Sequence, residues 1–402
     1  MIRHQLPGYS PLTLGGIMVA AARGVAAGRA VGFELEAYLS ERFRGEEVVL
    51  TGSGTQALQL ALGYGFMEGP GAGRPVALPA YACFDLVTAA VGAGVPVVFY
   101  DVDPAHLGPD ADSFRRVIAD GAGTVVVGNL YGFPLDWDWI RGECGREGVL
   151  VVEDAAQGVG SEWKGRAGGT FGDLTVLSFG RGKGWTGGGG GALISRGRAR
   201  VTPYVDGIEP EPWTDVVASA ASAVAQWAMG RPWLYGIPAA VPALRLGETR
   251  YKEPRTVREM SGFSAALVLG SAEGARSEIA LRCAHARRWR EVLSEGLSGV
   301  PLRVCDAVVG GTSGYHRFPV VTGGTAMAQD ILRRARSLGI AAGYPVPLHR
   351  LPSSRPLMSG APADRPGAEE LAAALLTFPT HSRLRDGEVS RTVCLIRAAK
   401  ST

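Results

Sequence analysis

Residues 148–157 read Gly-Val-Leu-Val-Val-Glu-Asp-Ala-Ala-Gln, and this stretch decides the expected fold. The continuous apolar run from Gly148 to Val152 is typical of a strand that is buried on both faces at the centre of a parallel sheet. Asp154 follows this strand, at the end where parallel sheets place ligands. A helix N-cap is the other ordinary position for such an aspartate, so the rest of the chain has to distinguish the two.

Similar apolar runs recur on both sides of this stretch, with helical stretches between them. The strand candidates are residues 48–50, 76–78, 95–100, 124–127, 149–152, 175–178 and 192–194. This alternation predicts an α/β fold whose central sheet is mostly parallel and is covered by helices.

The chain has 402 residues, enough for a large domain and a smaller one. We expect an N-terminal segment and large domain over residues 1–235, with a connector or insertion rich in Pro, Trp and Ala at 200–255. A smaller α+β C-terminal domain is expected over residues 250–402. Within the connector, the apolar run 216–229 is shorter than the roughly 20 residues of a membrane span. It favours a buried or interface helix over a membrane-surface element.

Composition narrows the function classes. The 41 basic side chains nearly balance the 38 acidic ones, and the net charge is +3, so nucleic acid is not an expected partner. Five cysteines without a CxxC pair indicate no metal site and fit the reducing cytoplasm. The first residues contain Pro7 and polar groups instead of the apolar run of an export signal, so we expect a cytoplasmic protein with small-molecule ligands.

Lys183 closes the segment Ser-Phe-Gly-Arg-Gly-Lys, residues 178–183, at the end of another strand candidate. A lysine that can form an imine with an aldehyde, paired with a buried carboxylate that can keep a pyridine nitrogen protonated, is the minimum equipment for pyridoxal 5'-phosphate (PLP) chemistry. The surrounding glycines let the backbone approach a ligand closely, which a surface lysine does not need. Lys183 and Asp154 together therefore predict PLP as the cofactor.

The segment from Thr51 to Leu58 follows a strand and opens a helix, so it can offer backbone N–H groups and a positive dipole end to a phosphate. It also matches the loose dinucleotide fingerprint GxGxxA. No acidic residue stands about 20 positions later, where residues 76–79 are Val-Ala-Leu-Pro, so a nicotinamide or flavin cofactor is disfavoured. Gly184 after Lys183 excludes a Walker A motif and ATP binding there.

These segments together resemble the DegT/DnrJ/EryC1/StrS family of PLP-dependent sugar aminotransferases, of the fold type I class. The resemblance covers about residues 25–195 and is carried by Ser53-Gly54-Thr55-x-Ala57-Leu58, Pro79-Ala80-Tyr81, Leu130-Tyr131-Gly132-x-Pro134, Glu153-Asp154-Ala155-Ala156-Gln157 and Ser178-Phe179-x-x-x-Lys183. Residues 344–349, Tyr-Pro-Val-Pro-Leu-His, are a weaker match in the C-terminal part.

The resemblance implies that Lys183 binds the cofactor and then moves a proton. Asp154 would hold the pyridine nitrogen, Gln157 would lie beside the ring, and Tyr81 or a neighbour would stack on it. The implied phosphate-binding residues are Ser53, Gly54, Thr55 and Ser178.

The implied reaction is transfer of an amino group from glutamate or glutamine to a keto sugar or related small ketone in a biosynthetic pathway. The implied assembly is a homodimer with active sites at the interface. A PLP-dependent lyase, dehydratase or carbon–carbon bond-forming enzyme is the alternative on the same fold, although related sugar dehydratases carry histidine in place of Lys183. A PLP-binding regulatory protein is a third interpretation, which would require a damaged site.

Two departures from the family pattern concern the phosphate. Residues 257–260, Val-Arg-Glu-Met, lack the asparagine that in many members reaches the partner's phosphate site. Arg181 replaces a usual residue before the lysine, and we hypothesise that it supplies phosphate charge. His349 and His381 are open candidates for the substrate side, with a turn role favoured for His381.

Overall fold

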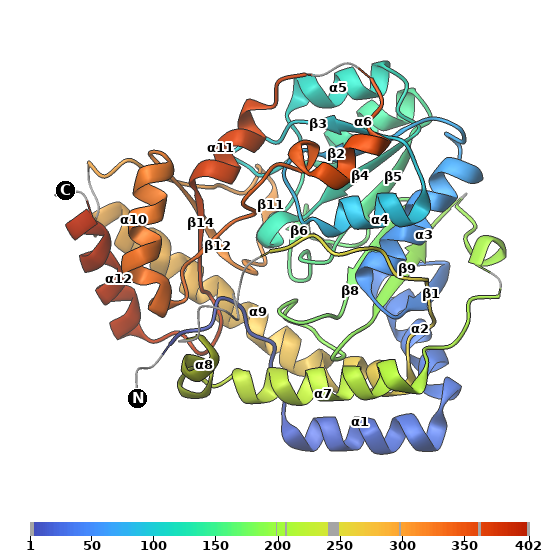
Figure 1. The fold of residues 1–402 in the computed structure, drawn as a ribbon, viewed down its shortest axis with the longest axis horizontal. Helices are drawn as coiled ribbons and strands as arrows, with labels where there is room; N and C mark the ends of the chain where they lie inside the picture. The colour runs from blue at the N-terminus through green and yellow to red at the C-terminus, as the bar shows by residue number, and fades with distance from the viewer. Residues whose placement is uncertain are drawn as a thin grey trace.

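The computed structural model describes residues 4–197, 199–205, 207–239, 249–296, 299–360 and 363–399. Its centre is a seven-stranded sheet with the order β1-β9-β8-β5-β4-β2-β3 (Figure 1). The strands are β1 (Glu47–Thr51), β2 (Val76–Pro79), β3 (Val97–Tyr100), β4 (Thr124–Gly128), β5 (Leu150–Asp154), β8 (Leu174–Ser178) and β9 (Gly191–Ser195). Only β9 runs against its neighbours. The predicted, mostly parallel α/β fold is confirmed.

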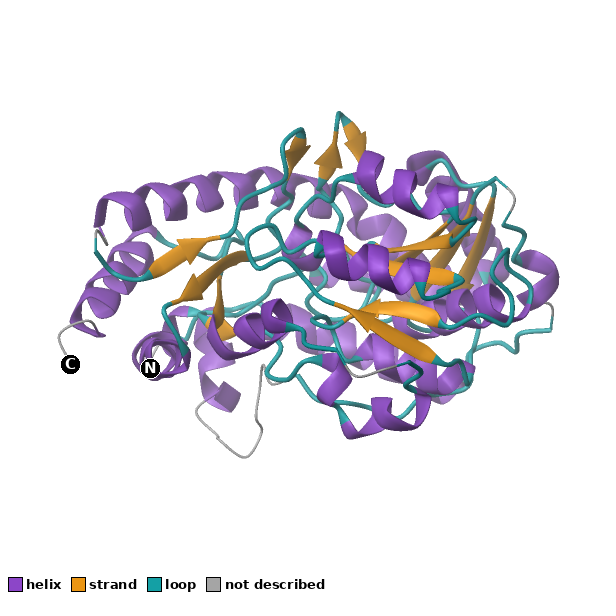
Figure 2. Cartoon of the chain, turned by 90° about the horizontal axis from the view of Figure 1, so that it is seen from above, coloured by secondary structure: helices purple, strands orange, loops and turns teal. Residues whose placement is uncertain are grey.

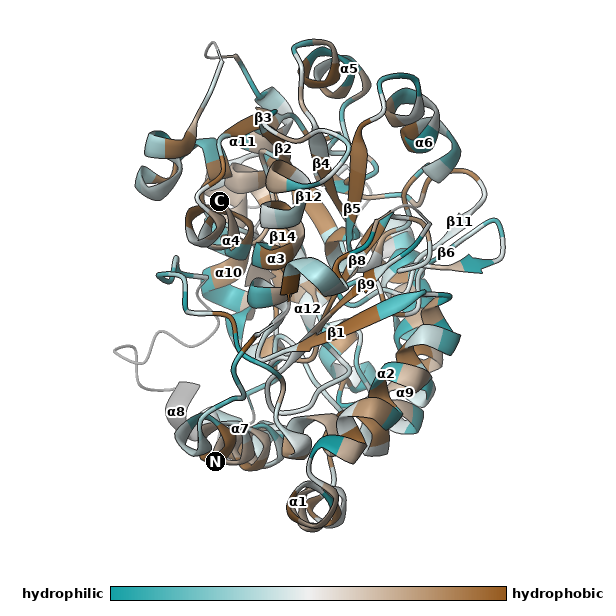
Figure 3. Ribbon diagram, turned by 90° about the vertical axis from the view of Figure 1, so that its right-hand side faces the viewer, coloured by the Kyte–Doolittle hydropathy of each residue, from teal (hydrophilic) through white to brown (hydrophobic). Residues whose placement is uncertain are grey.

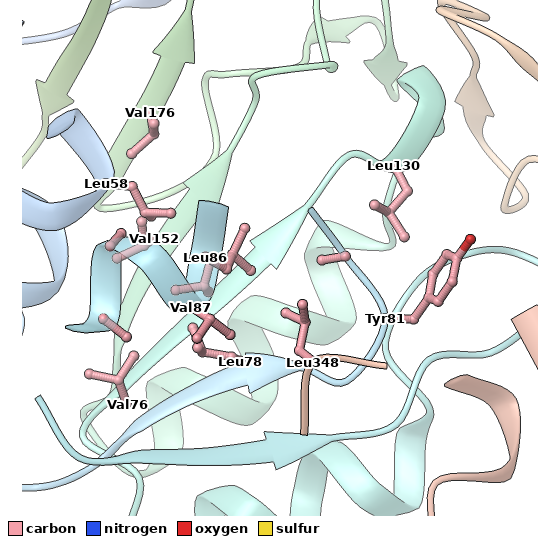
Figure 4. Close-up of a cluster of buried hydrophobic side chains, with 14 of the residues drawn as sticks. Leu58, Val76, Leu78, Tyr81, Leu86, Val87, Leu130, Val152, Val176 and Leu348 are labelled. Carbon is pink, nitrogen blue, oxygen red and sulfur yellow. The ribbon is translucent and has the colours of Figure 1, made fainter. Parts of the chain in front are cut away.

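Helices cover both faces of this sheet, as the purple helices around the orange strands show in Figure 2. Successive side chains of a strand point to opposite faces, and Val126 packs under α3 (Gly54–Met67) and α4 (Asp85–Ala93), in the cluster drawn in part in Figure 4. Its neighbours Val125 and Val127 pack under α5 (Ala111–Ala119) and α6 (Trp137–Arg146). The continuous apolar run of each strand is thus explained by burial on two sides.

A second, antiparallel sheet lies in the C-terminal part, with the order β10-β12-β14-β13. Its strands are β10 (Leu302–Val304), β12 (Phe318–Thr322), β13 (Ala341–Ala342) and β14 (Leu375–Phe378), and the helices around it are α10 (Thr325–Ala335), α11 (Pro366–Ala374) and α12 (Asp386–Ala399). A third small sheet joins β6 (Glu162–Trp163), β7 (Arg166–Ala167) and β11 (Gly311–Thr312).

The helix α9 (Gly262–Gly296) belongs to two cores. Its first half, from Phe263 to Ala275, packs with α1 (Leu14–Ala27), α2 (Arg29–Phe43) and β9. Its second half, which includes the buried Trp289, packs with β12, α10 and α12. The division into two domains near residue 250 stays a prediction.

The connector folds into a 3-10 turn (Thr202–Val205) and the helices α7 (Trp213–Met229) and α8 (Pro232–Ala239), while residues 240–248 lie outside the described residues. α7 lies beside α1 at the edge of the molecule (Figure 1). Its buried residues are Ala223 and Gln226, so a buried helix does not describe it.

The outer faces of α1 and α7 carry exposed apolar side chains, and α1 is largely brown at the bottom of Figure 3. The large ones are Leu14, Met18, Val19, Val25, Trp213, Val217, Val224 and Met229. In the described part of the chain no single helix has the length and apolar composition of a membrane span. Only α1 and α2 taken together meet both measures, and they are bent by 114°.

Candidate active site

Neighbouring strands bring two of the predicted site residues to one edge of the central sheet. β5 ends at Asp154 and β8 ends at Ser178, and in the parallel register Asp154 pairs with Val176. Both residues thus lie at the carboxyl edge of the sheet, where open α/β sheets bind ligands.

A cavity at this edge brings together Asp154, Gln157 and Lys183. Its other lining residues are Pro79, Ala82, Cys83, Leu86, Gly128, Asn129, Leu130, Ala156 and Tyr344. A carboxylate, an amide and an amine in one largely apolar cavity suit a ligand with a cationic nitrogen and polar ring substituents.

The Asp154 carboxylate is prepared for a cationic partner. Burial raises its pKa, while the positive charge of Lys183 and the Ala156 N–H, which donates to Oδ1 at 3.1 Å, lower it. In the part of the chain that the structure describes, Ala156 is the one hydrogen-bond donor to this carboxylate. A protonated pyridine nitrogen would add a second donor and a further positive charge.

Two glycines in left-handed conformations determine the backbone course of the loop that carries Lys183. Gly182 has φ 78° and Gly184 has φ 81°, which side chains rarely adopt. A Cβ atom at Gly184 would also lie 2.5 Å from the guanidinium of Arg282. The glycines of this loop are therefore required by geometry, as expected for a lysine that faces a ligand.

The predicted phosphate-binding residues gather at the N-terminus of α3. Ser53 caps this helix, with its Oγ accepting the Gln56 N–H at 3.2 Å. Gly54 lies against Ser178, because a Cβ atom at Gly54 would be 2.8 Å from Ser178 Oγ. A helix N-terminus beside a serine hydroxyl is an anion-binding arrangement, and Thr55 stands in the first turn.

Tyr81 does not line the cavity. Its buried hydroxyl accepts the Tyr344 N–H at 2.9 Å and lies 3.4 Å from Tyr131 Oη. Figure 4 shows this hydroxyl pointing away from Leu78, Val87 and Leu348. Ala82 and Cys83 line the cavity at this place, so the geometry gives no support to stacking by Tyr81.

Arg181 is also outside the lining of the cavity. Its side chain is exposed, and its charge opposes the rise that burial causes in the pKa of Tyr235 on α8. Its proposed contact with phosphate stays a prediction.

The segment 257–260 lies beside the predicted phosphate-binding corner of its own chain, which Ser53, Gly54 and Ser178 form. The Gly52 N–H donates to Arg258 O at 2.9 Å. The Gln56 side chain accepts the Arg258 N–H at 3.2 Å and donates to Thr256 O at 3.0 Å. Gln56 was not among the predicted site residues. Its position within the segment 53–58, which resembles the family, was the signal in the sequence that could have identified it.

Three residues near the cavity were missed from the sequence. Tyr344 and Cys83 line it, and both stand in or beside segments that matched the family pattern. His316 is half-buried near Lys183 and hydrogen-bonds to the Gly182 backbone, and desolvation holds its pKa well below the usual value. No pattern in the sequence distinguished His316.

The two histidines left open lie elsewhere. His349 is 3.3 Å from the Glu369 carboxylate and packs near the Phe99 ring. His381 is buried in a turn, with Nε2 3.0 Å from Leu6 O.

The fold and this cavity match the architecture expected of a fold type I enzyme. The model of the DegT/DnrJ/EryC1/StrS aminotransferase family matches residues 24–202 and 248–397, and the chain belongs to this family. The expected resemblance is confirmed. The unmatched residues 203–247 include α7 and α8.

Several relatives are named as aminotransferases of sugars or cyclitols. A UDP-N-acetyl-3-dehydro-alpha-D-glucosamine 3-aminotransferase of Acidithiobacillus ferrooxidans is 24% identical over 86% of this chain and 82% of its own. A dTDP-4-dehydro-2,3,6-trideoxy-D-glucose 4-aminotransferase of Saccharopolyspora spinosa is 28% identical over 87% and 83%. An L-glutamine:2-deoxy-scyllo-inosose aminotransferase of Streptomyces kanamyceticus is 36% identical over 36% and 33%.

Solved structures share the fold over the whole chain. The aminotransferase TlmJ of Streptoalloteichus hindustanus has 27% identity, a TM-score of 0.73 and 99% coverage of both chains. The PLP form of a Streptococcus pneumoniae protein has 18% identity, a TM-score of 0.73 and 99% coverage of both.

Proposed function

We propose that this aminotransferase uses PLP to move an amino group from glutamate or glutamine to a keto sugar or a related cyclic ketone. The observation that carries the proposal is the cavity shared by Asp154, Gln157 and Lys183. The names of the relatives, which include two nucleotide-linked keto sugars and a cyclitol ketone, support this class of acceptor.

Each residue has a role that its surroundings support. When bound, PLP supplies an aldehyde that takes up the amino group and a ring that withdraws electrons. Lys183 would hold the cofactor through its amine and later carry a proton to and from the substrate carbon. Asp154 would keep the ring nitrogen protonated, with Gln157 beside the ring. Ser178 and the N-terminus of α3 would hold the phosphate.

A homodimer is part of the proposal. The exposed apolar side chains on α1 and α7 form a surface of the kind that marks protein interfaces. A cytoplasmic location is supported by the cysteines, since all five are free thiols.

The test is to trap the cofactor on the protein. Purified protein is loaded with PLP, reduced with borohydride and digested, and the mass of each lysine peptide is measured. We expect the cofactor on the Lys183 peptide and its loss in Lys183→Ala. Lys164→Ala, at an exposed lysine that pairs with Asp138, is the matched control.

Adding amino donors distinguishes transamination from the other reactions that PLP enzymes catalyse. Loss of the visible absorption of the lysine-bound cofactor with glutamate or glutamine supports transamination. A cofactor band that ignores every donor would favour a PLP lyase or bond-forming enzyme, and no PLP uptake by the wild type would refute the proposal.

A further inference from the structure

Three tyrosines from distant parts of the chain meet beside the cavity. The Tyr344 ring stacks on the Tyr131 ring, with centroids 6.1 Å apart and planes 19° apart. It meets the Tyr81 ring at 5.5 Å and 62°. Among these three, Tyr344 alone lines the cavity that holds Asp154 and Lys183.

The position of Tyr344 is fixed without its own hydroxyl. Its backbone N–H donates to Tyr81 Oη at 2.9 Å, and the N–H of Gly343 donates to Leu375 O at 3.0 Å. A Cβ atom at Gly343 would lie 2.0 Å from Tyr81 Oη, so a residue with a side chain would displace the tyrosine. Removing the Tyr344 hydroxyl should therefore leave the ring in place.

Gln157 determines which way the hydrogen bond to Tyr344 runs. The backbone N–H of Tyr131 can only donate, and it donates to Gln157 Oε1 at 2.8 Å. This contact fixes the orientation of the amide, so Nε2 donates to Tyr344 Oη at 2.8 Å. The phenol oxygen is thus an acceptor, and its own proton is left for another group.

That proton has no acceptor in the described part of the chain. Gln157 is the single hydrogen-bond partner of the Tyr344 hydroxyl there. The side chain is 7% exposed, and burial raises its pKa well above the usual value, so the phenol stays neutral and keeps its proton. A buried O–H group normally has a partner.

We propose that Tyr344 is a further ligand-binding residue, whose O–H donates to an anionic or carbonyl oxygen presented beside Gln157. This inference rests on the proposed function, because the oxygen belongs either to the ring hydroxyl of PLP or to the carbonyl of the keto acceptor. In both cases Gln157 orients the phenol, and the phenol makes the contact.

The test compares Tyr344→Phe with the wild type. Two quantities are measured: the Kd of the apoprotein for PLP by equilibrium dialysis, and the KM and kcat for 2-deoxy-scyllo-inosose with glutamine as donor. Tyr100→Phe is the matched control, because it removes a buried tyrosine hydroxyl that donates to Val126 O and does not line the cavity. Thermal unfolding of both variants reports on the loss of a buried hydrogen bond.

Two results support the inference and identify the oxygen. If the oxygen belongs to PLP, Tyr344→Phe raises the Kd for PLP about tenfold, as expected for a hydrogen bond to a charged group. The pH at which the visible band of the bound cofactor titrates then also moves upward, because the negative oxygen loses a stabilising donor. If the oxygen belongs to the acceptor, the Kd and the titration are unchanged, and kcat/KM for the ketone falls about tenfold.

The inference is overturned if Kd, titration and kcat/KM all stay within about twofold of the wild type while both variants lose similar stability. The hydroxyl would then have a structural role only. A wild type that binds no PLP would be recognised before any variant is compared, and it would remove the proposed function together with this inference.

A second variant guards against misfolding of the first. In Gln157→Glu the carboxylate can accept the Tyr344 proton, so the hydroxyl is no longer available to a ligand. Adding Tyr344→Phe to this variant should then change Kd and kcat/KM little. Full additivity of the two substitutions would contradict the arrangement.

Discussion

Gly54 and Ser178 touch across the predicted phosphate-binding corner, so closely that a Cβ atom at Gly54 would lie 2.5 Å from Ser178 Cβ. One residue opens α3, and the other ends β8. The contact joins the helix N-terminus to the strand that leads into the Lys183 loop.

This contact makes Gly54→Ala a sharp test of the corner. Overpacking of this kind destabilises proteins by about 1–3 kcal/mol, and the displaced Ser178 should also weaken PLP binding. Urea unfolding and PLP titration check both effects. Gly270→Ala is the control, because this position in α9 has open space around it and alanine should stabilise the helix by about 0.5–1 kcal/mol. Equal behaviour of the two variants would contradict the close contact between Gly54 and Ser178.

Arg181→Ala is expected to weaken the retention of PLP by about twofold to fivefold, which is the range for a solvent-exposed charge. Equilibrium dialysis of PLP gives the number. Arg116→Ala, an exposed arginine on α5, should have no effect. Unchanged affinity in Arg181→Ala would refute its role as a phosphate ligand. The N-terminus of α3 would then be the source of the positive potential at the phosphate.

His381 should make the fold sensitive to acid. Burial lowers its pKa to about 3, and the nearby charges of Arg282 and Arg317 act in the same direction, while the hydrogen bond between Nε2 and Leu6 O opposes this shift. The folded pKa is below the usual 6.5, so the unfolded chain binds more protons between these values. The stabilisation is complete above pH 6.5 and is lost as the pH falls toward 3.

Denaturant unfolding at several pH values measures this loss. We expect His381→Gln to reduce the slope of unfolding free energy by about 1 kcal/mol per pH unit between pH 6 and 4. The control is His106→Gln, at a histidine whose hydrogen bond to Asp306 O is exposed to solvent. An unchanged slope in His381→Gln would show that other groups cause the acid sensitivity.

The apolar surface on α1 allows a test of the homodimer. Val25 is 89% exposed there, and Val309 is 96% exposed elsewhere. Val25→Asp should weaken dimerisation by about tenfold or more, since a charge would be buried in an apolar contact, whereas Val309→Asp should not. Sedimentation velocity over a concentration series distinguishes them. A dimer that tolerates Val25→Asp must use another surface.

The central sheet was predictable because its signals are local. Each of its strands is a short apolar run, such as residues 149–152, that burial on two faces demands. The reversed direction of β9 was not predictable, since Gly191–Ser195 carries the same kind of run in either direction. The order and direction of the strands depend on packing between residues that are far apart in the sequence.

The candidate site shows the same limit. Asp154, Gln157 and Lys183 lie in motifs that can be recognised in the sequence, and the structure brings them into one cavity. Tyr344 reaches Gln157 from 187 residues away, through a second sheet. The Tyr81 hydroxyl accepts the backbone N–H of this distant Tyr344, so a local pattern could not reveal that the Tyr81 ring turns toward Tyr344.

Because α9 packs in two cores, its synthesis determines when the first of these cores can be closed in a newly synthesised chain. Residues up to Ser195 contain the whole central sheet, but the core that α1 and α2 share with this sheet also needs Phe263 to Ala275. A chain still emerging from the ribosome must therefore leave the inner faces of these helices uncovered until about eighty further residues have been added. During that interval the uncovered apolar faces of α1 and α2 expose the nascent chain to aggregation.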